Sequence, residues 1–290
     1  MTWAPHLKFL TSGSANLKLS WRADSIAVRW CFHTHAGRSK RGQLIECTLQ
    51  GAGKDVRGFA TDFRLINTLR IALAEAWERF VFRLYREEEL SPVQSRYRTT
   101  GYAAGKTALS AQQAAQEEYL ERHLLVLAIK PHAIWQPYIF QGFYNHKLWG
   151  HLSQILGPTE SYVFEGKPGQ RVLFGWAHTQ QGPIFDSVYL NTQSERTSAR
   201  RFLLSLLGTS PPANRNNLQI NPLTEKVMSV LGDCASLETR LVYPGGPLPP
   251  VALAFDPHAR APYLNQLSQD EIFASLFLKA HQSPQTKYCH

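Results

Sequence analysis

Residues 58–80 read GFATDFRLINTLRIALAEAWERF, and residues 101–123 read GYAAGKTALSAQQAAQEEYLERH, which repeats the same pattern further along the chain. An internal repeat is worth interpreting first because it shows how a chain is built. Each copy predicts a glycine-containing loop that leads into a helix whose middle carries Glu-x-x-Glu-Arg. Aligned without a gap, the copies share Gly58/Gly101, Ala60/Ala103, Ala72/Ala115, Glu75/Glu118, Glu78/Glu121 and Arg79/Arg122.

The glutamates of the repeat are the candidate metal ligands. Residues three apart share one face of a helix, so Glu75 lies beside Glu78, and Glu118 beside Glu121. Like charges at this spacing repel each other, so helix stability alone does not explain them. Four carboxylates brought together would suit Mg²⁺, a hard cation that prefers oxygen ligands and carries nucleotide phosphates.

The alternative is a solvated helix face on which Glu75 pairs with Arg79, and Glu118 with Arg122, at favourable i,i+4 spacing. Apolar residues bracket both acidic stripes, which predicts helices that are covered on two sides. Together with the repetition, this favours a site. The bracketing residues are Ile71 and Phe82 on the first helix and Ala114 and Leu125 on the second.

The loop Gly101-Tyr-Ala-Ala-Gly105-Lys106-Thr107 resembles a phosphate-binding loop. It has three residues between its glycines where the Walker A motif has four. A small-residue loop that enters a helix still offers backbone N–H groups and a favourable dipole to an anion. Lys106 would add positive charge there, or it is an ordinary solvated lysine.

At these residues the sequence resembles the YcaO family. That family has a helix with the pattern Ser-Ala-Leu-x-Glu-Ala-x-Glu-Arg, and Ala72-Leu-Ala-Glu75-Ala-Trp-Glu78-Arg79 matches most of it. A second family pattern, Asn-Gly-x-Ala-Ala-Gly-x-Thr followed by Glu-x-x-Glu-Arg, is matched by residues 101–107 and 118–122. The resemblance extends over about residues 51–130.

The resemblance implies an α/β (α+β) ATP-binding fold with two repeated loop–helix units packed on β-sheet, and ATP and Mg²⁺ as cofactors. It implies an enzyme that uses ATP to activate a backbone amide of a ribosomally made precursor peptide, which yields an azoline, a thioamide or an amidine. A charge-neutralising metal and arginine suit such phosphoryl chemistry. The resemblance assigns Glu75, Glu78, Glu118 and Glu121 to the metal and Arg122 to a phosphate contact. With Arg122, we take Lys106 of the loop and Arg79 as candidate nucleotide-binding residues.

The chain also departs from the family pattern. Ile71 stands where the family carries a serine, and Gly51-Ala-Gly53-Lys54 is the nearest remnant of its Gly-Lys-Gly. The family's C-terminal arginine and glutamate contacts cannot be placed in residues 170–290. A second hypothesis is therefore a non-catalytic YcaO-like subunit that scaffolds a modification complex.

Composition adds a third hypothesis. The 290 residues carry a net charge of +9, which favours an anionic partner, and 43% hydrophobic content is enough for a large core. The third hypothesis is a basic nucleic-acid-binding protein, and the alternative interpretation of its basic clusters is a pair of solvated faces. The two basic clusters are Arg38, Lys40 and Arg41, and Arg196, Arg200 and Arg201.

Other expectations concern organisation and location. We expect one domain over residues 1–290, strands at 25–32, 43–49 and 172–177, and helices at about 63–89, 110–129 and 195–207. No secretion signal or membrane-length apolar run is visible, and four cysteines are too few for a disulfide scaffold, so we expect a cytoplasmic protein. The expected partners are the precursor peptide, a protein that presents its leader, and a second copy of the chain.

One further motif has metal-ligand residue types. Cys31, His33 and His35 alternate, so a strand would place all three on one face. No second ligand cluster is close in sequence. Polar residues on an exposed strand are the favoured interpretation.

Overall fold

The computed structural model describes residues 8–21, 24–36, 43–51, 54–62, 65–89, 101–179, 182–191, 194–208, 237–246, 248–256 and 269–282. The chain forms two compact units. Unit 1 comprises Met1–Ser95, Gly101–Gln116 and Thr239–Phe255, and unit 2 comprises Arg96–Thr100, Glu117–Glu238 and Asp256–His290. A single functional domain over residues 1–290 stays a prediction.

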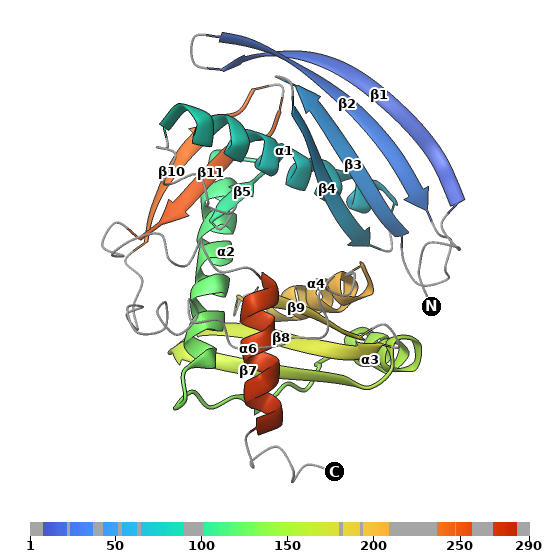
Figure 1. Ribbon diagram of the computed structural model, residues 1–290, viewed down its shortest axis with the longest axis vertical. Helices are drawn as coiled ribbons and strands as arrows, with labels where there is room; N and C mark the ends of the chain where they lie inside the picture. Colours follow the sequence, from blue (N-terminus) through green and yellow to red (C-terminus); the bar gives the residue numbers. More distant parts are fainter. Residues whose placement is uncertain are drawn as a thin grey trace. The chain divides into compact units, whose positions relative to one another are not determined.

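Unit 1 consists of two sheets with a long helix, α1 (Leu65–Glu89) (Figure 1). The first sheet is a four-stranded antiparallel meander in the order β1-β2-β3-β4, and the second has the order β10-β11-β5. The strands are β1 (Lys8–Trp21), β2 (Asp24–Ala36), β3 (Gln43–Gly51), β4 (Lys54–Asp62), β5 (Tyr102–Ala104), β10 (Glu238–Tyr243) and β11 (Val251–Phe255).

The packing of α1 on β4 depends on a missing side chain. A Cβ atom on Gly58 would lie 2.1 Å from the Ala72 carbonyl oxygen and 2.3 Å from the Ala76 nitrogen. Because glycine has no Cβ, the strand and the helix backbone approach this closely. Gly58 lies within strand β4, so the prediction of a loop at this position of the repeat is wrong. In the first copy, Gly58 instead allows close strand–helix packing.

The other side of α1 contacts the three-stranded sheet. The Trp77 ring meets Tyr243 edge-on at 5.1 Å, and Phe82 meets Tyr102 edge-on at 5.0 Å. The indole N–H of Trp77 donates to the Pro249 carbonyl at 2.9 Å. Aromatic pairs of this geometry add to the burial energy of the rings, so α1 is held from both sides within unit 1.

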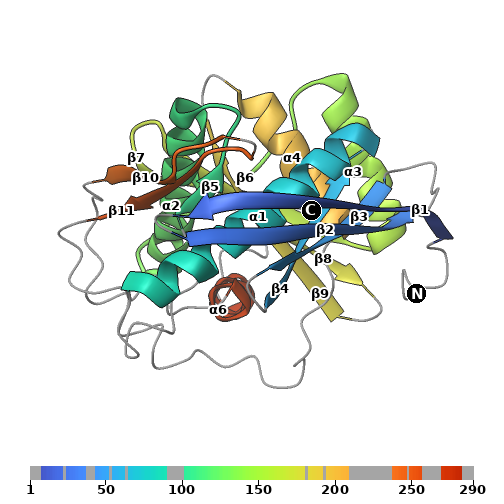
Figure 2. The same ribbon diagram turned by 90° about the horizontal axis from the view of Figure 1, so that it is seen from above.

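Unit 2 is a four-stranded antiparallel sheet, in the order β6-β7-β8-β9, with helices on both faces (Figure 2). Alternate residues of β8 separate the faces: Leu173 and Ala177 join the core formed with α3 and α4, whereas the Trp176 ring contacts α6. The elements are β6 (Gln136–Pro137), α3 (Phe143–Leu156), β7 (Thr159–Lys167), β8 (Gln170–Thr179), β9 (Gly182–Leu190), α4 (Glu195–Gly208) and α6 (Gln269–Gln282).

Helix α2 (Ala108–Ile129) begins in unit 1 and continues in unit 2 from Glu117. The predicted helices correspond to α1, α2 and α4, and the predicted strands to β2, β3 and β8, so these predictions are confirmed. No helix in the described part of the chain is both long and apolar enough to cross a membrane.

Candidate functional site

Glu78 joins the middle of α1 to the start of the second repeat copy. Its Oε1 accepts a hydrogen bond of 2.6 Å from the backbone N–H of Ala104, at the end of β5. The next residue, Gly105, donates its N–H to the Pro250 carbonyl at 3.1 Å. A Cβ on Gly105 would lie 2.2 Å from the nitrogen of Ala111, so glycine is required for the loop to fold against the first turn of α2.

The second oxygen of Glu78 is available for a ligand. Within the described part of the chain, Oε2 has no hydrogen-bond partner. Burial raises the pKa of Glu78 to about 8, with the hydrogen bond from Ala104 opposing the shift and the Glu75 charge adding to it. A carboxylate that is costly to ionise gains from a bound cation, because the cation supplies the missing positive charge.

Glu75, one turn earlier, is already engaged. Its Oε2 accepts a 2.5 Å hydrogen bond from the N–H of Phe59 in β4, and its Oε1 forms an ion pair with Arg79. Arg79 also donates to the Arg57 carbonyl at 2.8 Å, so both side chains fasten α1 to β4. Burial raises the pKa of Glu75, and the Arg79 charge opposes the rise. The i,i+4 pair of the alternative interpretation is therefore confirmed here.

Lys106 and Thr107 lie where the loop meets α2. The N–H of Thr107 donates to Ser110 Oγ at 2.9 Å and the N–H of Ser110 to Thr107 Oγ1 at 3.2 Å, a reciprocal cap of the helix start. Lys106 is exposed and borders an open cleft of about 470 Å³ within unit 1. The cleft is lined by Lys106, Thr107, Ala108, Pro244, Gly245, Gly246, Leu248, Pro249 and Pro250.

In unit 2, Glu121 connects α2 to β9. Its Oε1 accepts a 2.6 Å hydrogen bond from the Ser187 hydroxyl, and its Oε2 accepts a 3.3 Å hydrogen bond from the N–H of Tyr189. One turn earlier, Glu117 accepts a 2.8 Å hydrogen bond from the Asn191 side chain. Burial raises the pKa of Glu121, while the Arg122 charge and the hydrogen bonds from Ser187 and Tyr189 lower it.

Asp186 is a buried acid in β9 that the sequence reasoning missed. Its Oδ1 accepts a 2.7 Å hydrogen bond from the N–H of Ser187, and its Oδ2 is buried without a well-formed hydrogen bond among the described residues. Burial raises the pKa of Asp186 to about 7, although Ser205 and Arg122 oppose the shift. The available signal was an aspartate inside the run Gly182–Leu190, because aspartate is depleted in strands.

The predicted residues thus form two groups. Glu75 and Glu78 belong to unit 1, whereas Glu118, Glu121 and Arg122 belong to unit 2. Arg122 lies close enough to Glu121 and Asp186 to lower both pKa values, and Glu118 is partly buried on the same helix. The convergence of the four glutamates on one ion stays a prediction.

The expectation that apolar residues cover both sides of the first acidic stripe is half right. Phe82 is 7% exposed, whereas Ile71 is 48% exposed, so the prediction is wrong at Ile71. On the second helix Leu125 is buried and Ala114 partly buried. Residues 31–35 lie in β2 as expected, but the side chains of the Cys31–His35 motif lie outside the described ones.

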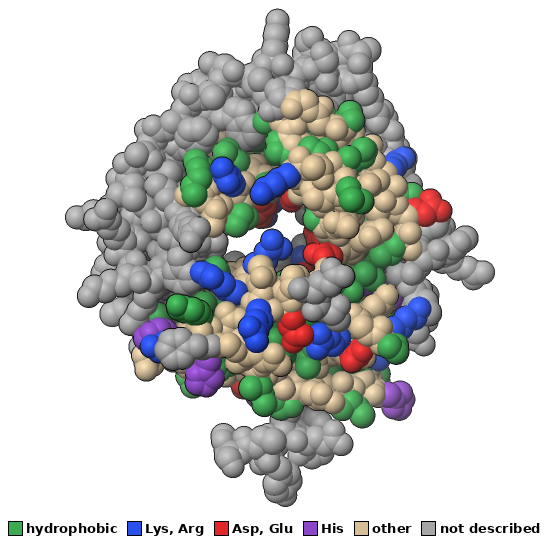
Figure 3. Space-filling model, turned by 180° about the vertical axis from the view of Figure 1, so that it is seen from behind, with side chains coloured by type: hydrophobic (Ala, Val, Ile, Leu, Met, Phe, Trp, Pro, Cys, Tyr) green, Lys and Arg blue, Asp and Glu red, His purple; other side chains and the backbone are tan. Residues whose placement is uncertain are grey.

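The predicted basic cluster on α4 is at the surface. Arg196, Arg200 and Arg201 are all exposed. On the face drawn in Figure 3, Lys and Arg side chains are interspersed with Asp and Glu side chains. The cluster of Arg38, Lys40 and Arg41 lies outside the described residues.

Comparison with known proteins supports the fold. No protein-family model matches the sequence, and no curated protein matches it either. Among solved structures, the chain is similar to YcaO from Methanopyrus kandleri bound with AMPPCP and Mg²⁺. The TM-score is 0.53 and the sequence identity 11%, and the match covers 85% of each chain. The predicted fold class, a YcaO-like arrangement of helices on β-sheet, is therefore confirmed.

Proposed function

We propose that this protein binds ATP with Mg²⁺ and uses it to activate a backbone amide of a ribosomally made precursor peptide. The observation that carries the proposal is Glu78, a carboxylate held against the glycine loop with one oxygen engaged and the other available. The repeat motifs and the likeness to a YcaO that binds AMPPCP and Mg²⁺ support the same assignment.

The donor types fit the proposed cation. Mg²⁺ takes oxygen ligands and is usually held by one or two protein carboxylates together with phosphates and waters. Glu78 offers such an oxygen, and Glu118 and Glu121 are the candidates from the second repeat copy. Bound Mg²⁺ would neutralise charge on the phosphates. Lys106 and Arg122 are the proposed phosphate contacts, and Arg79 acts through Glu75 by fixing α1.

The proposed reaction consists of two successive displacement steps. The peptide amide oxygen attacks the γ-phosphorus of ATP and ADP leaves. A thiol, hydroxyl, sulfide or amine then attacks the activated carbon and inorganic phosphate leaves, giving azoline, thioamide or amidine. A partner protein that presents the leader of the precursor peptide, and self-association of the chain, belong to the same proposal.

Isothermal titration of ATP into the full chain tests the assignment of the second repeat copy. Glu118→Gln and Glu121→Gln keep the side-chain size and remove the charge, so each should weaken Mg²⁺-dependent ATP binding at least about tenfold. Glu165→Gln is a matched control, because Glu165 is an exposed glutamate on β7. Binding that is equal in all three variants and independent of Mg²⁺ contradicts the proposal.

One observation favours a scaffolding subunit as the second candidate. Both oxygens of Glu75 and both oxygens of Glu121 accept hydrogen bonds or ion pairs from the protein itself. Carboxylates used in this way fasten helices to strands whether or not an ion binds. A chain that binds no ATP with its natural partner present, yet remains in the complex with that partner, would establish this candidate.

A further inference from the structure

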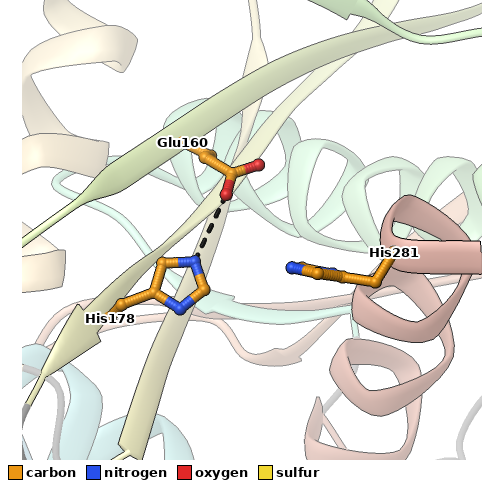
Figure 4. Close-up of side chains that lie close together, drawn as sticks. All are labelled: Glu160, His178 and His281. Carbon is orange, nitrogen blue, oxygen red and sulfur yellow. Dashed lines mark hydrogen bonds and ion pairs between the residues drawn. The ribbon is translucent and has the colours of Figure 1, made fainter. Parts of the chain in front are cut away.

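Glu160, His178 and His281 form a second cluster of ligand-type side chains, entirely within unit 2 (Figure 4). Each contributes one ligand atom, and these atoms all lie within 4.8 Å of one another. His178 Nε2 is 3.2 Å from Glu160 Oε1. None of the three belongs to the repeat or to the groups described above.

Strand pairing places the first two residues on one face. Glu160 on β7 lies opposite Trp176 on β8, so His178, two residues further, is the diagonal neighbour of Glu160 on the same face. Helix α6 covers this face with Phe273, Phe277 and His281, which follow one another at four-residue steps. The His281 ring contacts both Trp176 and His178, at centroid distances of 6.2 and 6.1 Å.

Helix α6 is also fixed along its axis. Lys279 Nζ donates to the carbonyls of Ala128, Lys130 and Ala133 at 2.6–2.9 Å, at and just after the C-terminal end of α2. His281 lies two residues after Lys279. The position of the His281 side chain is therefore determined by an anchored helix and not by a free terminus.

Hydrogen bonds prepare two of the side chains as ligands. His281 Nδ1 donates to the Phe277 carbonyl at 2.8 Å, and because a carbonyl only accepts, this bond leaves the lone pair on Nε2. The Tyr162 hydroxyl donates to Glu160 Oε2 at 2.7 Å and leaves Oε1 facing His178. Metal-binding histidines and carboxylates characteristically have outer contacts of this kind.

The distance between two of the ligand atoms fits a small tetrahedral ion. Ligand atoms about 2.05 Å from Zn²⁺ lie about 3.3 Å apart at the tetrahedral angle, close to the 3.2 Å between His178 and Glu160. We propose that Glu160, His178 and His281 bind one Zn²⁺ ion. Two imidazoles and a carboxylate favour Zn²⁺ over Mg²⁺, and this set leaves the fourth position to water or another donor.

The site is open to solvent, so an ion has a route in. The side chain of Glu160 is 36% exposed and that of His178 is 33% exposed. His281 is exposed near the end of its helix. The proposal is independent of ATP binding, because it uses other residues and another cation.

Metal titration of the full chain tests the proposal. After chelator treatment and dialysis, Zn²⁺ is titrated in competition with a coloured chelator, and Co²⁺ is added separately as a spectroscopic probe. We expect one Zn²⁺ per chain that excess Mg²⁺ does not displace. We also expect visible Co²⁺ bands typical of a tetrahedral site, without a thiolate charge-transfer band. Such a band would assign the ion to a cysteine site instead and overturn the proposal.

Matched variants identify the ligands. Glu160→Gln and His281→Gln should each weaken Zn²⁺ binding at least about tenfold, whereas His151→Gln, an exposed histidine on α3, should bind as the wild type does. Thermal unfolding without metal shows that each variant is folded. Equal Zn²⁺ affinity in the wild type, Glu160→Gln and His281→Gln overturns the proposal, as does the absence of binding by the wild type.

Discussion

Glu78 Oε1 lies 2.6 Å from the backbone nitrogen of Ala104 and accepts its hydrogen bond. This contact joins the acidic stripe of the first repeat copy to the glycine loop of the second. A carboxylate oxygen satisfied by a loop N–H has a fixed orientation, so the second oxygen is fixed as well. The proposed Mg²⁺ site uses that second oxygen.

The pH dependence of stability reports on Glu78. Burial raises its pKa from 4.5 to about 8 in the folded state. Between pH 4.5 and 8 the folded chain therefore keeps a proton that the unfolded chain has lost, and stability falls as the pH rises. The glutamine of Glu78→Gln does not ionise, so this fall in stability with pH is absent from the variant. We expect the free energy of unfolding of the variant to exceed that of the wild type by about 1–2 kcal/mol at pH 8.5. This is less than the full pKa shift implies, because the Glu78 side chain is partly exposed.

Denaturant unfolding followed by circular dichroism at pH 5 and pH 8.5 measures this difference. The free energies of unfolding of Glu78→Gln and the wild type should differ only at the higher pH. Glu165→Gln, at an exposed glutamate, should show no such difference. A difference of the same size at both pH values would mean that packing, and not ionisation, separates the two proteins.

Gly58→Ala should destabilise unit 1. The added Cβ would lie 2.1 Å from the Ala72 carbonyl oxygen, and backbone atoms cannot move away without shifting α1 from β4. We expect a loss of about 1–3 kcal/mol or more, as overpacking usually costs. Gly150→Ala is the control, because nothing lies within 4 Å of a Cβ there and alanine stabilises a helix. Unfolding midpoints that shift equally would refute the close-packing explanation.

Lys279→Met should loosen α6. The ammonium group donates to three carbonyls at and just after the C-terminal end of α2, and its removal takes one donor from each. The Ala128 carbonyl keeps the Trp135 indole N–H and the Lys130 carbonyl keeps the Ala133 N–H. Hydrogen bonds from a charged group contribute about 1.5–3 kcal/mol each, and a loss of about 2–4 kcal/mol is expected after water replaces some of them. Lys147→Met on α3, at an exposed lysine, should cost far less. Hydrogen exchange at α6 amides measures the effect, and unchanged exchange rates would contradict it.

Local patterns predicted much of the fold. The repeat predicted α1 and α2 and singled out Glu78, and the fold adds the contact of Glu78 with Ala104. Gly58 was misplaced because a glycine inside a strand gives the same local signal as a loop. Its role comes from the approach of a helix that starts several residues later.

Residues whose role comes from long-range packing could not be predicted. Asp186 is a single acid in an apolar strand, and only the surrounding layers bury it. His178 and His281 lie in different elements far apart in the chain, and strand register together with the seating of α6 brings them to Glu160. The sequence contains each residue but no spacing that relates them.

Proton release when ATP and Mg²⁺ bind at pH 7 tests the proposed cation site at Glu78 most directly. A group with a pKa of about 8 is about nine-tenths protonated at that pH, so an ion that binds Glu78 must displace that proton. Calorimetric titration in buffers of different ionisation enthalpy counts the protons released. We expect the wild type to release about one more proton than Glu78→Gln. Equal proton release by the two proteins, with equal affinity, would contradict the proposed site.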